Sequence, residues 1–135
     1  MKLNGKELRL IPGAIMVYLC VPLHHARRDG EVLSEDKVVL DKLDKRISIA
    51  SEDAYRPHLK QGMSWAEMVE VYLKASLDFE FTHKEKQALA RALDACAVEL
   101  EVDPEADVNI NFSGDGYGIR REDFVEMRKR LLGEV

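Results

Sequence analysis

Cysteine is scarce in this chain, and its scarcity excludes a fold held together by disulfides. Cys20 and Cys96 are the only two among 135 residues, and they form neither a CxxC pair nor the spacing of a zinc knuckle. Both lie in apolar segments, where a free thiol behaves as a small hydrophobic side chain. We therefore expect two buried core thiols and no structural disulfide.

Long apolar runs are also missing from the chain. The longest, residues 14–23, is too short to span a bilayer. It also begins too far from a basic N-terminus to resemble a usual signal peptide. These two features predict a cytoplasmic protein that does not bind membranes.

The chain has no excess of basic residues and no phosphate-binding loop. Its 20 lysines and arginines are outnumbered by 25 acidic residues, and the net charge of −5 argues against general nucleic-acid binding. Gly114, Gly116 and Gly118 lack the strand and helix that surround a dinucleotide fingerprint. The remaining partners are a protein or a cation, and the oligomeric state stays open.

The residues that are present predict a mainly α fold. An apolar fraction of 46% is enough for one compact core at this length, so we expect a single domain over residues 1–135. Apolar residues at helical spacing predict a bundle of four to five helices. The clearest of these helices cover residues 34–47, 64–77, 82–100 and 119–132.

Residues that favour helix ends support these assignments. Ser64 with Glu67, and Thr82 with Glu85, have the spacing of capping boxes. Ser34 is placed to cap the first of the four helices, and a glycine follows the last one. The first helix should bury Val38, Val39, Leu40 and Leu43, and the last should bury Phe124, Met127 and Leu131. We expect the middle two helices to pack against each other through Trp65, Met68, Tyr72, Leu89, Leu93 and Cys96.

Three stretches lack a clear helical pattern. Residues 14–23 fit either a β-hairpin that turns at Pro12 and Gly13 or a buried helix from Pro12 to Arg28, which Pro22 opposes. Residues 49–62 read as an irregular connection or a short helical turn. Apolar residues alternate with asparagine over residues 108–112, so small β elements are expected there and at the N-terminus.

An Asp-Gly turn followed by an acidic helix start occurs twice, at residues 29–36 and 115–123. The second copy has the spacing of a calcium loop, with Asn111 at position one, Ser113 at three, Asp115 at five and Glu122 at twelve. Two carboxylates supply little charge, so we expect at most weak Ca²⁺ binding and no other cofactor. In the first copy an arginine would stand at position three, which excludes a standard EF-hand.

Around both turns the chain resembles the TerB-like tellurite-resistance helical domains. The resemblance rests on residues 26–35 and on residues 114–122 together with Leu132 and Gly133. It implies a mostly helical, non-enzymatic, stress-associated domain. It also implies six acidic candidate metal ligands, namely Asp29, Glu35, Asp36, Asp115, Glu122 and Asp123.

Catalytic residues are poorly marked in this sequence. Cys20 and His24 would share a face if residues 14–28 were helical, but no third ligand or orienting acid is indicated by the spacing. We therefore expect no enzyme. The sequence predicts a regulatory or interaction protein that binds a protein partner, and the alternative is a cation-binding domain that uses its acidic turns.

Overall fold

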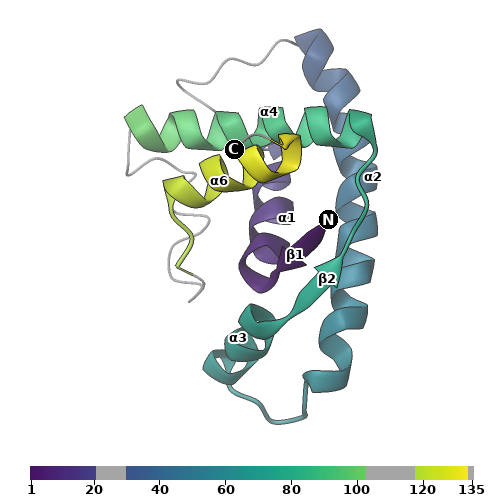
Figure 1. Cartoon of the computed structure of the whole chain (residues 1–135), viewed down its shortest axis with the longest axis vertical. Helices are drawn as coiled ribbons and strands as arrows, with labels where there is room; N and C mark the ends of the chain where they lie inside the picture. The colour runs from purple at the N-terminus through teal and green to yellow at the C-terminus, as the bar shows by residue number, and fades with distance from the viewer. Residues whose placement is uncertain (21–29, 103–117, 134–135) are drawn as a thin grey trace.

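The computed structural model describes residues 1–20, 30–102 and 118–133 and shows the mainly α fold that the sequence predicts. Within these residues, five α-helices accompany a two-stranded antiparallel sheet. Figure 1 shows α1 at the centre, where it contacts α2, α3 and α4. In chain order the elements are β1 (Lys2–Asn4), α1 (Gly5–Cys20), α2 (Gly30–Tyr55), the 3-10 helix η1 (Arg56–His58), α3 (Trp65–Lys74), β2 (Ser76–Asp78), α4 (His83–Val102) and α6 (Arg121–Leu132).

The small sheet ties the N-terminus to the segment that follows α3. β1 runs antiparallel to β2, with Leu3 opposite Leu77. The Met1 ammonium donates to the Phe79 carbonyl at 3.0 Å, and the Phe79 N–H donates back to the Met1 carbonyl at 2.9 Å. The β element expected at the N-terminus is therefore confirmed, whereas the one expected at residues 108–112 lies outside the described residues.

Helix α1 begins at Gly5 and passes through Pro12, so the β-hairpin prediction is wrong. The alternative, a buried helix, is right for residues 14–20 but places the helix start too late, and its predicted end at Arg28 lies outside the described residues. Asn4 and Glu7 start the helix with a capping box that was not among the predicted ones. The Glu7 N–H donates to Asn4 Oδ1, and the Asn4 N–H donates to Glu7 Oε1, each at 2.9 Å. An interior proline costs about 3 kcal/mol. Each large side chain buried along α1 contributes about 1.5–3 kcal/mol, so burial outweighs the proline and residues 14–20 are helical.

Helix α2 begins before Ser34 and ends at Tyr55, so it is longer at both ends than predicted. Its buried residues recur at helical spacing as Asp36, Leu40, Leu43, Ile47 and Ser51. Because Asp36 and Ser51 are polar, a pattern of apolar residues alone does not show the full helical stripe of α2. The Ser51 hydroxyl donates to the Ile47 carbonyl at 2.6 Å and is thereby satisfied inside the helix. Val38, which was expected on the buried face, is 57% exposed.

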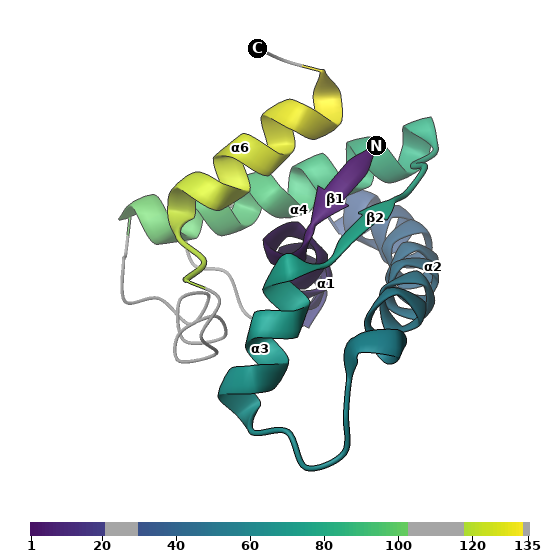
Figure 2. The same cartoon turned by 60° about the horizontal axis from the view of Figure 1, so that its bottom comes forward.

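Helices α4 and α6 lie side by side and confirm the predictions for this part of the chain (Figures 1 and 2). Thr82 and Glu85 form the expected capping box, with N–H to oxygen distances of 2.8 and 3.2 Å. The left-handed Gly133, at φ 71°, ends α6. The predicted residues of α6 are buried against the core, namely Phe124, Met127 and Leu131.

Helix α3 differs most from its predicted surroundings. Ser64 and Glu67 form the expected capping box, but the helix ends at Lys74 because the next residues pair in β2. It packs mainly against α1, whereas the prediction paired it with α4. Gly5 permits this approach, because a Cβ added there would overlap the Tyr72 carbonyl and lie 2.6 Å from Leu73 Cα. Figure 2 shows α3 at the opposite side of the molecule from α6.

Candidate functional site

The predicted calcium loop lies mostly outside the described residues. Asn111, Ser113 and Asp115 are there, as is Asp29 of the first Asp-Gly turn. Glu122 is exposed in the first turn of α6. Among residues 1–20, 30–102 and 118–133, no three His, Cys, Asp or Glu side chains are grouped to hold a metal ion. Calcium binding therefore stays a prediction.

Asp36 is the buried centre of a polar contact that joins three helices. It is 1% exposed, although it was a candidate metal ligand. Arg91 Nε of α4 donates to Asp36 Oδ2 at 2.9 Å, and the Tyr18 hydroxyl of α1 donates to the same oxygen at 3.1 Å. The hydrogen bond with Asp36 raises the pKa of Arg91 above its usual value. Asp36 thus links α1, α2 and α4 through partners from the protein itself.

The other acidic candidates in the described residues lie at the surface or at a helix start. Glu35 is exposed on α2. Asp123 accepts a hydrogen bond from the Arg120 N–H at 2.7 Å and pairs with Lys6 at 3.2 Å. This carboxylate therefore starts α6 and connects it to α1.

The two cysteines have opposite environments. Cys96 is buried in α4, as predicted, and burial followed by the charge of Glu99 raises its pKa to about 12. Cys20 is exposed at the end of α1, which contradicts its prediction as a core thiol. Cys20 is the last residue of α1, and the final turn of the helix carries its thiol to the surface. The apolar run around Cys20 does not predict this exposure. His24, its suggested partner, lies outside the described residues.

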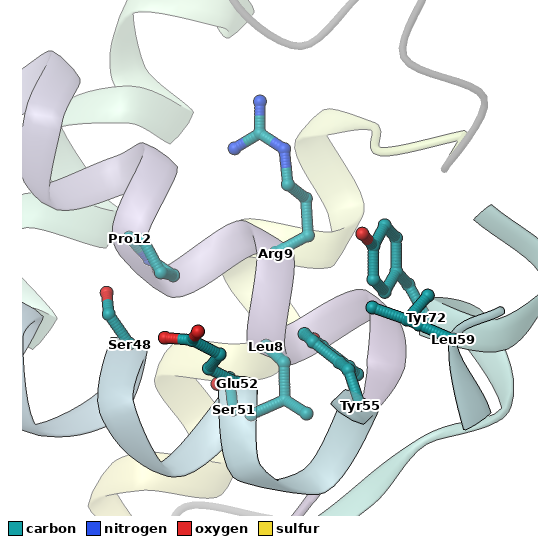
Figure 3. A pocket seen from close by; sticks show the side chains of 9 residues that line it. All are labelled: Leu8, Arg9, Pro12, Ser48, Ser51, Glu52, Tyr55, Leu59 and Tyr72. Carbon is teal, nitrogen blue, oxygen red and sulfur yellow. The ribbon is translucent and has the colours of Figure 1, made fainter. Parts of the chain in front are cut away.

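An open groove of about 440 Å³ lies between α1, α2 and α3, and we call it the tyrosine groove (Figure 3). Helix α1 supplies one wall and the C-terminal half of α2 supplies the other, while Tyr72 comes from α3. The lining residues are Leu8, Arg9, Pro12, Ser48, Ser51, Glu52, Tyr55, Leu59 and Tyr72.

Three aromatic side chains, here called the aromatic row, follow one another in contact: Tyr55 and Tyr72 line the tyrosine groove, and Trp65 adjoins it through Tyr72. The Tyr55 and Tyr72 ring centroids are 4.6 Å apart, with the rings tilted by 59°. Trp65 extends the row edge-on to Tyr72, with centroids 6.3 Å apart. Helix α2 places Tyr55 because it continues to that residue. The capping box at Ser64 starts α3 at Trp65, and Tyr72 follows about two turns later on the same face. Close contact at Gly5 then holds α3 against α1.

The lining of the tyrosine groove is mostly apolar or neutral, with one cationic side chain, Arg9, and one carboxylate, Glu52. Burial raises the pKa of Tyr55, the charge of Tyr72 adds to this, and a hydrogen bond with Ser51 opposes it. Tyr55 is therefore an uncharged phenol near neutral pH. Glu52 stands on the rim, where its carboxylate lies 3.3 Å from Arg56 in an exposed pair. Such a lining can hold an apolar ligand and orient it with a few polar contacts.

Sequence reasoning found part of this groove. Trp65 and Tyr72 belong to the apolar stripe expected on residues 64–77, but the stripe was assigned to the core. Tyr55 falls within residues 49–62, for which the sequence predicts an irregular connection or a short helical turn and no binding site. The spacing of Ile47, Ser51 and Tyr55 on one helical face was the signal that could have found it.

Comparisons with protein-family models, curated proteins and solved structures find no match to this chain. In the part of the chain that the structure describes, no helix has the length and apolar character needed to cross a membrane.

Proposed function

We propose that this protein is a non-enzymatic interaction or regulatory protein that binds a protein partner through the tyrosine groove and the adjoining face of α3. The exposure of Trp65, at 55%, beside the paired rings of Tyr55 and Tyr72 carries this proposal. Tryptophan and tyrosine are the side chains that most often dominate the energy of protein interfaces.

The apolar face of α3 has more hydrophobic surface than the fold uses. Of its ten residues, all of which the structure describes, Val69 alone is buried. Trp65 and Leu73 remain exposed, and Met68 and Tyr72 are half-buried. Burying this face against a partner would remove apolar surface from water at roughly 25 cal/mol per Å². An apolar centre with a polar rim such as Glu52 and Arg56 has the organisation of a binding surface.

The test uses the full-length protein with Trp65→Ala and a matched control, Val38→Ala. Val38 is exposed to the same degree, at 57%, but lies ten residues before Ser48 on α2, about 15 Å along the helix from the groove. Immobilised proteins are incubated with extract of the source cells, and the retained proteins are identified by mass spectrometry. The affinity of each purified candidate is then measured by calorimetry.

We expect a protein that wild type and Val38→Ala retain equally, and that Trp65→Ala binds at least about 10-fold more weakly. Retention that is equal for all three proteins would place the interaction elsewhere and contradict the proposal. Loss of binding in Val38→Ala as well would point to a general defect in folding, which far-ultraviolet circular dichroism of both variants detects.

A further inference from the structure

We infer that the segment of the partner bound in the tyrosine groove is an extended, proline-rich stretch with a basic residue beside its prolines. This inference rests on the function proposed above, because it names the chemistry of the partner at the same site. Three features of the groove carry it: the row of aromatic rings, the hydroxyl groups along the walls, and an acidic group on the rim.

The row of rings matches the repeat of an extended polyproline II helix. Successive centroids from Tyr55 to Tyr72 to Trp65 are 4.6 and 6.3 Å apart. A polyproline II helix rises about 3.1 Å per residue, so neighbouring rings meet residues about one to two positions apart. Aromatic-lined grooves are the common receptors of such segments because flat rings pack against the proline ring.

The hydroxyl groups favour this backbone over a helical one. Ser48 is exposed in one wall, and the Tyr55 side chain lies at the end of the groove (Figure 3). A polyproline II helix has no internal hydrogen bonds, so its carbonyl oxygens are available to such donors. An α-helix has already used its backbone carbonyls except for the last four, so along most of its length it offers only side chains. The groove thus provides polar contacts that an extended segment uses and a helix does not.

The carboxylate of Glu52 on the rim favours a ligand that has a basic residue beside its prolines. The Glu52 side chain is 71% exposed and pairs with the equally exposed Arg56 at 3.3 Å. Such an exposed pair is weak, and a cation of the ligand can therefore compete for the carboxylate. In Figure 3 the Arg9 side chain extends away from the Glu52 carboxylate, which leaves the acid at the groove edge on the α2 side. The net charge of −5 adds to the attraction for a basic segment.

Trp65 provides a direct probe, because it is the single tryptophan of the chain and adjoins the groove. Its fluorescence is followed while the protein is titrated with blocked peptides that contain no tryptophan. The first probe is an oligoproline of about eight residues ending in arginine, and the second is the same peptide ending in glutamine. The third is an amphipathic alanine-leucine helix of equal charge, and sedimentation velocity of the protein alone tests for a second copy as occupant.

We expect a saturable change in Trp65 emission with the arginine-ended oligoproline, and weaker binding of the glutamine-ended one. Tyr72→Leu should weaken binding about 2- to 10-fold because it removes the ring, whereas Tyr72→Phe should retain most of it. Glu52→Gln should weaken the arginine-ended peptide about 2- to 5-fold and leave the glutamine-ended peptide unchanged. Val38→Ala should match wild type with every peptide.

Tighter binding of the helical peptide, equal binding by Tyr72→Leu and wild type, or self-association through Trp65 would each overturn the inference. So would the absence of any response to both oligoprolines. If a cellular partner is still retained in a manner that depends on Trp65, only the proline-rich ligand is wrong. If retention does not depend on Trp65 either, the proposed function fails as well.

Discussion

Helices α6 and α3 are both amphipathic, but the fold treats them in opposite ways. Three apolar side chains of α6, Phe124, Met127 and Leu131, are at most 2% exposed. The corresponding face of α3 buries Val69 and leaves Trp65 in contact with water. Amphipathic spacing thus predicts that a helix has an apolar face, but it does not say whether that face is covered by the same chain.

Polar contacts reinforce the difference between the two helices. Salt bridges connect α6 to its neighbours. Arg130 pairs with Glu7 of α1, and Arg128 pairs with Asp94 of α4 at 2.8 Å. For α3, the contact at Gly5 and the pairing of the following β2 with β1 hold it in place. Stability should therefore be concentrated around α1, α4 and α6, and the surface of α3 should be freer to change without unfolding the protein.

The largest expected contrast is between two leucine substitutions. Leu93 is fully buried in α4, so Leu93→Ala should lower the free energy of unfolding by about 2–5 kcal/mol through lost burial and a cavity. Leu73 of α3 is 39% exposed, and Leu73→Ala should cost less than about 1 kcal/mol. Urea unfolding followed by circular dichroism measures both. Equal losses of unfolding free energy would mean that Leu73 of α3 contributes as much to the core as Leu93 of α4.

The next effect concerns the contact that positions α3. Gly5→Ala would place a Cβ against the Tyr72 carbonyl and near Leu73 Cα, so the backbone of α3 must move. We expect a loss of about 1–3 kcal/mol, as for other overpacked sites, together with a changed Trp65 emission spectrum. Gly62→Ala serves as a control, because its Cβ would meet open space and only its φ of 83° opposes the change. Unaltered stability and emission in Gly5→Ala would disprove the close contact.

The helix caps should show a smaller and more local difference. Thr82→Ala and Ser64→Ala each remove a side-chain oxygen that accepts an N–H at 3.2 Å, and each should cost about 1 kcal/mol. The loss at Thr82 should lower global stability, because Glu85 of the same box also holds Arg46 of α2. The loss at Ser64 should appear mainly as faster amide hydrogen exchange within α3. Faster exchange throughout the protein in Ser64→Ala would contradict this division.

Calcium is expected to have the smallest effect, on the side of α6. If residues 111–122 form the predicted loop, binding should fall on the order of 10⁻⁴ to 10⁻³ M, and Glu122→Gln should abolish any rise in melting temperature caused by calcium. Without calcium the same substitution should change stability by at most about 1 kcal/mol, through the helix dipole. A titration without heat or thermal shift at millimolar calcium would mean that these acidic turns have a structural role and do not bind calcium.

Helix starts were predictable because their chemistry is local. The boxes at Ser64 and Thr82 each involve residues three positions apart, and both form as predicted. Asn4 and Glu7 have the same spacing and could have placed the start of α1. The full length of α2 was harder to predict, since its buried stripe includes Asp36, whose burial depends on Arg91, 55 residues later.

The candidate site was predictable only as a set of side chains. Trp65 and Tyr72 are marked by helical spacing, but their exposure depends on α3 packing against α1 instead of α4. Tyr55 enters the groove because α2 continues past the expected end near Ile47. No pattern within α3 itself distinguishes a face that binds the core from a face that is left to a partner.

The sequence by itself determined the helical class, the capped starts of α3 and α4, and the inward residues of α6, because each depends on side chains within a few positions of one another. Only the tertiary structure decided that a helix continues through Pro12, that Cys20 is exposed, and that the rings of α2 and α3 meet in a groove. These outcomes depend on which distant surfaces compete for burial. That competition is a property of the whole fold, and no local pattern encodes it.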